Sequence, residues 1–404
     1  MRHTFAAALL IVAAPFASKA QTPVADAKYN HIVSVGAGRG KILQTNDFIS
    51  GTNGTGSPMT NQASARLAFG WQTTGKKEWE IAHRLPTFGI GVSTTWLDNK
   101  EEIGHPFSVF GFYDGVFWRH GANALRYNIE MGLAMHWKRY DRENNPNNIA
   151  IGTRTTVHIS LGVEYAYTLA DRWVFSLGAG VTHFSNGGLR KPNKGMNMFG
   201  GQARVAYLLR DNKLPHDLPT VPKRKANEID ITVGYGVRRY EVSPWDHPEV
   251  KWQYDPRAIY NAITLQAAFL HSYSTKGKYG GGISALYDDY LGSTTQASEE
   301  GRMIVGHGPM RKRFALGIFA AHEFCISRLG IVTQMGYYLH RPSGIEEKQQ
   351  KEPLFQRAGL KYTFPCNIHA GLNIYAHRLS VADFIEWNVG YSLPLNRKKS
   401  HTLN

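Results

Sequence analysis

The chain has 404 residues and a formal net charge of +15, with 46 Lys and Arg against 31 Asp and Glu. No stretch approaches the roughly 18 to 20 uninterrupted apolar residues of a membrane-spanning helix, which excludes a helical membrane protein. A soluble secreted protein or a β-barrel remains, and the 41 Gly, 20 Tyr, 19 Phe and 9 Trp favour the aromatic-rich strands of a barrel.

Residues 1–20 have the three-part pattern of a secretory signal peptide. Arg2 and His3 precede an apolar run over 5–16, and a small-residue exit follows at 18–20. We therefore expect cleavage of this segment and export, the alternative being a buried N-terminal helix. For an exported basic protein the expected anionic partners are lipid headgroups, and no nucleic-acid-binding motif is present.

Alternation with a period of two predicts long strands. In 173–182, for example, Trp173, Phe175 and Leu177 lie on one face, and small or polar residues such as Ser176 lie on the other. The alternating runs extend over about 10 to 15 residues, the length that a tilted strand needs to cross a bilayer. We predict about sixteen antiparallel strands. Their expected starts are near residues 30, 61, 79, 106, 125, 158, 173, 198, 228, 260, 277, 311, 328, 354, 367 and 384.

The connections alternate between short and long, as do the periplasmic turns and external loops of outer-membrane barrels. The exception is 210–227, a long basic connection that follows an even-numbered strand and that we interpret as a linker. It separates an eight-strand half at 29–209 from a second half at 228–395, and a basic tail follows at 396–404. Our first prediction is a single transmembrane barrel of about sixteen strands, and the alternative is two eight-stranded barrels in tandem. The two cysteines, Cys325 and Cys366, either stay free or form one bridge.

His183 and Ser185 stand at the end of the seventh predicted strand. Residues two apart on a strand share a face and stand about 6 to 7 Å apart at the backbone, within reach of a side-chain hydrogen bond. A neutral imidazole could then take the serine proton while the oxygen attacks an acyl carbonyl. By itself a His-x-Ser pair also fits two polar residues at a strand end.

The parity of the strand strengthens the catalytic interpretation. His183 and Ser185 continue the row of Trp173, Phe175 and Leu177, which we expect to face lipid, and they stand at the external end of the strand. Polar residues there would meet the ester linkages of a lipid in the outer leaflet.

The run 183–197 resembles the signature of the PagL-type lipid A 3-O-deacylases, which are eight-stranded outer-membrane esterases. The resemblance rests on His183 to Asn186, Gly188-Leu189, Pro192-Asn193 and Gly195, and it extends loosely over 29–209. It implies that His183 is the base and Ser185 the nucleophile. It also implies that Asn186 forms the oxyanion hole, with Gly188 as a second donor.

The chain departs from this family at Asn197, which stands where the family has a Glu that orients the imidazole. An Asn oxygen still accepts from the histidine Nδ1, but it stabilises the imidazolium less than a carboxylate does, so we expect slower acylation. Glu130 and Glu164 fall on lumen-facing rows and do not replace the missing acid.

Three basic residues follow the His-x-Ser pair. Arg190, Lys191 and Lys194 form either a solvated loop face or a site for the phosphates of lipid A.

A second polar group, His377, Asp383 and Glu386, is more typical of a network that braces a barrel interior than of a second site. The surrounding region, 376–391, resembles the closing strands of longer acyloxyacyl-hydrolase-like proteins.

The sequence therefore predicts a serine esterase, in the outer membrane of a Gram-negative bacterium, that removes an ester-linked acyl chain from lipid A. No metal-ligand spacing is evident, and the chemistry requires no cofactor. The expected partners are lipopolysaccharide and outer-membrane lipids. The alternative is a porin-like or structural barrel without catalysis, and an adhesin is a third interpretation.

Overall fold

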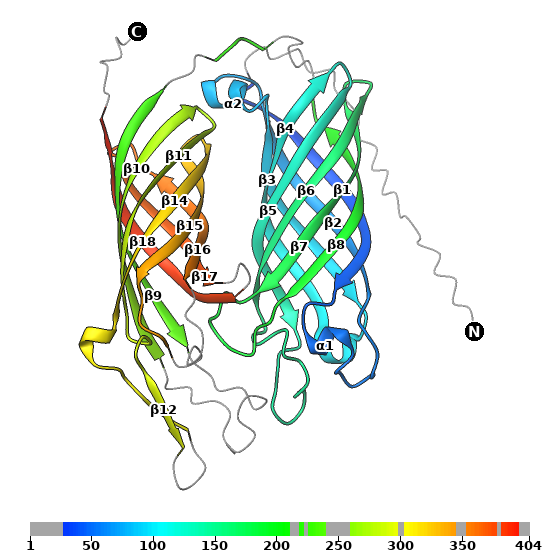
Figure 1. Ribbon diagram of the computed structural model, residues 1–404. Coiled ribbons are helices and arrows are strands. Elements are labelled where there is room, and N and C mark those ends of the chain that lie inside the picture. Colours follow the sequence, from blue (N-terminus) through cyan, green and yellow to red (C-terminus); the bar gives the residue numbers. More distant parts are fainter. Residues whose placement is uncertain are drawn as a thin grey trace.

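The computed structural model describes residues 27–210, 218–221, 225–239, 259–297, 303–344, 353–377 and 381–395. Within these ranges the antiparallel strands form two closed barrels of eight strands each (Figure 1). The first barrel comprises β1 (Tyr29–Leu43), β2 (Asn61–Thr73), β3 (Thr87–Leu97), β4 (Gly104–His120), β5 (Asn123–Trp137), β6 (Thr156–Leu169), β7 (Trp173–Ser185) and β8 (Met196–Leu208). The second comprises β9 (Ala226–Arg239), β10 (Ile259–Ser274), β11 (Gly277–Asp288), β14 (Phe314–Ile326), β15 (Leu329–His340), β16 (Leu354–Thr363), β17 (Ile368–His377) and β18 (Val381–Pro394). None of the helices in the described ranges is long and apolar enough to span a membrane.

Each barrel closes because its last strand returns to its first. β8 pairs with β1 from Ile32↔Leu208 to Leu43↔Asn197, and β18 pairs with β9 through contacts such as Val233↔Val389. Pairing of the first and last strands leaves neither barrel with an open edge. The prediction of one barrel of sixteen strands is therefore wrong, and the alternative of two eight-stranded barrels is confirmed.

One predicted strand start is also wrong. The segment near residue 79 forms the short helix α2 (Glu78–Ala82), and β3 begins only at Thr87. The carboxylate of Glu80 accepts hydrogen bonds from the backbone N–H groups of Gly75 and Lys76, at 3.0 and 2.9 Å, which stabilises a compact turn in place of a strand. The other predicted starts agree with the structure to within a few residues.

The remaining short elements lie in the long loops. They are α1 (Asp47–Ser50), α3 (Lys100–Ile103), the 3-10 turn η1 (Met310–Lys312) and a hairpin of β12 (Thr294–Ala297) and β13 (Met303–Gly306), which the sequence did not predict. Figure 1 shows α1 and β12 at one end of the molecule and α2 at the other. The long loops of both barrels therefore share one end, and the short turns share the opposite end.

The predicted alternation of faces is confirmed. On β7 the outward row is exposed, Leu177 by 69%, whereas the inward-facing Val174 is 2% exposed. Apolar side chains that face outward from a closed barrel are the signature of a lipid-facing surface. The chain is an outer-membrane-type barrel protein with two such surfaces.

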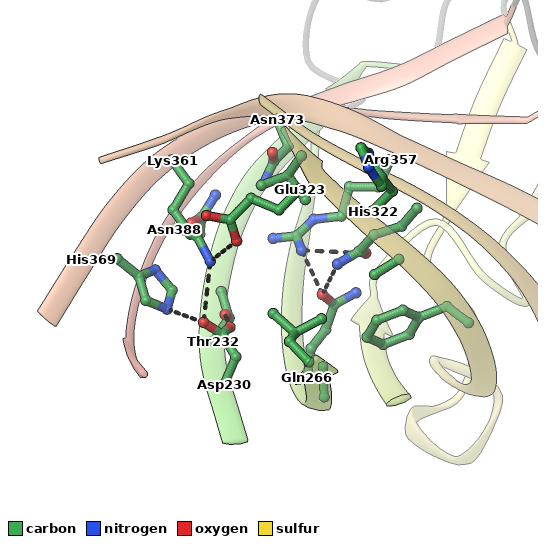
Figure 2. Close-up of a pocket in the computed structure, with 16 residues that line it drawn as sticks. Asp230, Thr232, Gln266, His322, Glu323, Arg357, Lys361, His369, Asn373 and Asn388 are labelled. Atoms are coloured by element: carbon green, nitrogen blue, oxygen red, sulfur yellow. Dashed lines mark hydrogen bonds and ion pairs between the residues drawn. The ribbon is translucent and has the colours of Figure 1, made fainter. Parts of the chain in front are cut away.

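Paired charges fill both lumens. In the first barrel Arg66 contacts Glu130 at 2.9 Å and Arg204 contacts both Asp114 and Glu164. The predicted lumen positions of Glu130 and Glu164 are therefore confirmed. In the second barrel, as Figure 2 shows, Lys361 bridges Glu323 and Asp230, His369 contacts Asp230, and Arg357 contacts Gln266.

The two barrels touch at both ends. At the short-turn end, His83 follows α2, and its Nε2–H donates to the backbone oxygen of Cys325 at 2.9 Å. The imidazole of His83 also packs edge-on against Phe324, with ring centroids 5.3 Å apart. At the long-loop end, the β7–β8 connection meets the start of β18, where Gly188 approaches Ala382 and Asp383.

Several predicted features lie wholly or partly outside the described residues. The signal peptide 1–20 and the tail 396–404 are among them, as is most of the linker 210–227. Cys325 and Cys366 are both free thiols, so they do not form the possible bridge.

Candidate functional site

The site lies where β7 and β8 end at the long-loop side of the first barrel. Leu43, the last residue of β1, pairs with Asn197, and Asn197 pairs in turn with His183. Between the predicted base and nucleophile, Phe184 points inward, is 1% exposed, and stacks edge-on against Trp137 with centroids 5.1 Å apart. Because residues alternate along a strand, burial of Phe184 directs His183 and Ser185 outward.

The three predicted catalytic side chains form a continuous hydrogen-bond relay. Ser185 Oγ–H donates to His183 Nε2 at 2.9 Å, and His183 Nδ1–H donates to Asn197 Oδ1 at 2.7 Å. Both distances are normal for hydrogen bonds that hold a nucleophile, its base and the group that orients the base. The structure thus brings His183, Ser185 and Asn197 together.

Thr45 orients the Asn197 amide. Asn197 Nδ2 donates to Thr45 Oγ1 at 3.3 Å, which turns Oδ1 toward the imidazole. This residue was missed by the sequence analysis, because it reaches the site only through the pairing of β1 with β8.

Asn186 and Gly188, the two predicted oxyanion donors, make hydrogen bonds within the connection itself. Asn186 Nδ2 donates to Arg190 O at 2.6 Å, and Gly188 N–H donates to Asn186 Oδ1 at 3.0 Å. The backbone N–H of Asn186 donates to Asn193 Oδ1 at 3.1 Å. Asn186 therefore shapes the turn, and Asn193 is a further amide beside the nucleophile that the sequence analysis did not single out for this role.

The long loop between β5 and β6, residues 138–155, contacts the β7–β8 connection, residues 186–195. The backbone N–H groups of Lys194 and Gly195 donate to Ile149 O and Ala150 O, both at 3.0 Å. Gly195, with φ +73°, lies so close to the relay that a methyl group on its Cα would stand 3.1 Å from His183 Cε1. Ser185 is only 8% exposed although it continues the outward row.

The three predicted phosphate-binding residues lie on the same connection. Arg190 and Lys194 are exposed, and Lys191 is half-buried. Their charges therefore lie on the connection between Ser185 and Asn197, at the long-loop end of the barrel.

The second predicted polar group does not join the relay. His377 forms an ion pair with Asp383, and Glu386 pairs with Arg357 in the lumen of the second barrel. The predicted bracing network is therefore present, and it belongs to the interior of the second barrel.

Two family models match the chain. One is described as lipid A 3-O-deacylase (PagL) and matches residues 63–206; the other is described as acyloxyacyl hydrolase, C-terminal domain, and matches residues 227–397. No curated protein matches the chain.

Solved structures similar to this chain include outer-membrane proteins. The outer membrane enzyme PagL is 17% identical with a TM-score of 0.30, and the match covers 42% of this chain and 97% of that one. Omp33 of Acinetobacter baumannii is 7% identical with a TM-score of 0.16, covering 91% and 99% of the two chains. OccAB2 of Acinetobacter baumannii is 9% identical with a TM-score of 0.21, covering 91% and 98%. Since one family model falls on each barrel, the chain belongs to the PagL-like lipid A 3-O-deacylase and acyloxyacyl hydrolase family of outer-membrane proteins.

Proposed function

We propose that this protein is a serine esterase that removes an ester-linked acyl chain from lipid A in the outer leaflet. The observation that carries the proposal is the relay from Ser185 through His183 to Asn197, with hydrogen bonds of 2.9 and 2.7 Å. The relay lies on an outward row at the long-loop end of the barrel, where we place the lipid headgroups of the outer leaflet. Family membership supports lipid A as the substrate.

The chemistry follows from the geometry of the relay. His183 Nε2 accepts the Ser185 proton as Oγ attacks the acyl carbonyl carbon, and a tetrahedral oxyanion forms. The oxyanion collapses, the sugar oxygen leaves with the proton from His183, and the acyl group stays on Ser185. Water, deprotonated by His183, then releases the fatty acid and regenerates the serine.

The oxyanion needs N–H donors next to Ser185. Asn186 and Gly188 remain the donors that the family resemblance implies, although both already have partners within the turn. Asn193 adds a third candidate, because its Oδ1 accepts from the Asn186 backbone at 3.1 Å and its Nδ2 carries two N–H groups. We propose that the side-chain NH2 groups of Asn186 and Asn193 supply the hole, and that Gly188 N–H joins them when its hydrogen bond to Asn186 Oδ1 is released.

The cations of the connection complete the substrate site. Arg190 and Lys194 are exposed on the connection that joins Ser185 to Asn197, where they could reach the phosphates of a lipid A molecule whose ester linkage lies at Ser185. We propose that they and Lys191 hold these phosphates and orient the acyl ester.

The filled lumens argue against the porin alternative. A cavity among the lumen side chains of the first barrel has a volume of about 80 Å³ and one in the second about 30 Å³, room for a handful of waters. A diffusion pore would require these ion pairs to separate. Reconstitution into planar bilayers should therefore give no steady open-channel conductance.

Mass spectrometry of lipid A tests the proposal. Outer membranes that contain the wild-type protein should show lipid A lacking one acyl group, and membranes with Ser185→Ala should not. The mass lost identifies the acyl group. Unmodified lipid A in both, with both proteins folded as judged by heat-modifiable gel mobility, would contradict the proposal.

A further inference from the structure

We propose that the second barrel positions the β7–β8 connection of the first barrel, here called the catalytic connection, through contacts with the start of β18 at Ala382, Asp383 and Ile385. This inference rests on the proposed function, because it assigns the second barrel a part in the same reaction. It is carried by contacts between Gly187-Gly188, which follow the nucleophile, and β18.

The two barrels are in direct van der Waals contact at this point. A methyl group on Gly188 Cα would stand 3.0 Å from Ala382 O and 3.1 Å from Asp383 O, and one on Gly187 would stand 2.9 Å from Ile385 Cδ1. Both glycines are buried, and both have positive φ, +63° and +84°. The backbone at Gly187 and Gly188 is thus packed against the surface of the second barrel, while Gly188 N–H donates to Asn186 Oδ1 of its own connection.

Exposure along β18 shows where the contact begins and ends. Ile385 is half-buried, whereas Trp387, Val389 and Tyr391, which continue its outward row, are exposed by 68%, 55% and 44%. Only the first outward positions of the strand are covered by the catalytic connection. The rest of this row remains a lipid-facing surface.

β18 has a β-bulge at Asp383, within the segment that contacts the catalytic connection. Tyr375 pairs with Phe384, but the next residue, Ala376, pairs with Ala382, so Asp383 is the extra residue. A bulge re-aims the side chain of its extra residue and frees backbone groups from the ladder. Here the Asp383 side chain turns into the lumen while its backbone oxygen faces Gly188.

Buried charges hold the bulge in place. Asp383 Oδ2 contacts Arg238 at 3.1 Å and also pairs with His377, and Arg238 contacts Asp288 at 3.0 Å. All four side chains are at most 9% exposed. The position of Asp383 is therefore determined by strands β9, β11, β17 and β18 together, which gives the catalytic connection a rigid wall.

The test compares two matched pairs of variants in the full-length protein, with purified lipopolysaccharide in detergent micelles as substrate. Ile385→Ala removes the contact with Gly187, and Val389→Ala makes a similar truncation on the same row outside the contact. Asp383→Asn weakens the buried cluster behind the bulge. Asp230→Asn weakens a similar cluster, with Lys361 and His369, elsewhere in the same barrel (Figure 2).

We expect Ile385→Ala and Asp383→Asn to lower kcat by roughly tenfold or more, because small misplacements of catalytic groups have effects of this size. KM should stay within about twofold, since the lipid contacts of the free site are unchanged. Val389→Ala and Asp230→Asn should retain wild-type kcat. Ile385→Leu should restore most of the activity that Ile385→Ala loses.

Two results would overturn the inference while leaving the proposed function intact. One is equal kcat for Ile385→Ala and Val389→Ala in folded proteins. The other is an equal loss for Asp383→Asn and Asp230→Asn, which would attribute the effect to the stability of the second barrel. Full activity of Ser185→Ala in the same assay would instead reject the proposed function, and the positioning role with it.

Discussion

His183 and Asn197 face each other across the β7–β8 pair, and the imidazole Nδ1–H donates to the amide Oδ1 at 2.7 Å. The Asn197 side-chain amide thus stands where the family that the sequence resembles has a Glu carboxylate, and the amide carries no charge. The bond selects the tautomer in which Nε2 is free to accept the Ser185 proton, but a neutral partner stabilises the imidazolium less.

Asn197→Asp tests whether the missing negative charge limits catalysis, because it replaces the amide nitrogen by oxygen and keeps the shape of the side chain. The carboxylate can accept from His183 at the same distance and adds the missing negative charge. We expect kcat to rise by roughly tenfold, since charge stabilisation of the imidazolium favours general-base catalysis. Asn197→Ala, which removes the acceptor, should fall well below wild type. Initial rates of fatty-acid release from lipopolysaccharide measure both, and an Asp variant no faster than wild type would show that the charge is not limiting.

Thr45→Val tests how the amide is oriented. Valine keeps the shape but removes the oxygen that accepts from Asn197 Nδ2 at 3.3 Å, so the amide can flip and turn N–H groups toward the imidazole. We expect a several-fold lower kcat, because the loss of one ordinary hydrogen bond changes a free energy by about 1 kcal/mol. In an Asn197→Asp background the same change should have little effect, because the two carboxylate oxygens are equivalent. A double-mutant cycle on kcat measures this coupling, and equal effects in both backgrounds would argue against an orienting role.

Gly195→Ala should disturb the relay by steric contact. The added methyl would stand 3.1 Å from His183 Cε1 and 3.5 Å from Ser185 Cβ. Gly56→Ala is a matched control, since Gly56 also has a positive φ, +63°, but a methyl there meets nothing within 4 Å. We expect at least roughly tenfold lower kcat for the first, a misplacement effect, and wild-type kcat for the second. Similar losses in both variants would point to backbone strain instead.

Contact between the barrels at α2 should depend on pH. Burial lowers the pKa of His83 to about 4, and the nearby Lys276 adds to this effect, although the hydrogen bond to Cys325 O opposes it. Because the docked form binds the proton less readily than a free histidine with a pKa near 6.5, docking is fully stable above pH 6.5. It weakens as the pH falls from there through about 4.

Spin labels can report this docking. One label on Cys366 and one on a cysteine introduced at Asp171, in a Cys325→Ser background, place probes on short turns of the two barrels. We expect the distance distribution to broaden between pH 6.5 and about 4. His83→Gln, which keeps an N–H donor but does not titrate, should show no such change. Broadening of equal size in both proteins would exclude His83 as its cause.

Local patterns predicted much of the fold. Alternation along 173–185 determined which side chains face lipid, and hence that His183 and Ser185 share the outward row. Strand starts could be predicted wherever this period was unbroken. This prediction failed near residue 79. Trp79 and Ile81 alternate as apolar residues of a strand would, but Glu80 stabilises a helical turn by accepting hydrogen bonds from the Gly75 and Lys76 amides.

Closure could not be predicted from these patterns. Whether β8 pairs with β1 or with β9 depends on hydrogen bonds between segments more than 150 residues apart, and any antiparallel strand of suitable length offers the same backbone groups. The choice between one barrel and two was therefore left open until the pairing was known.

For the site, the sequence by itself determined the residues that we propose as catalytic and the face on which they lie, because both follow from residue identity and a period of two. The tertiary structure alone decided their surroundings. The register of β8 against β7 and β1 set Asn197 between His183 and Thr45, and the docking of the second barrel set β18 against Gly188. Such contacts join residues that are distant in the chain, and they depend on how closed sheets pack rather than on any local pattern of side chains.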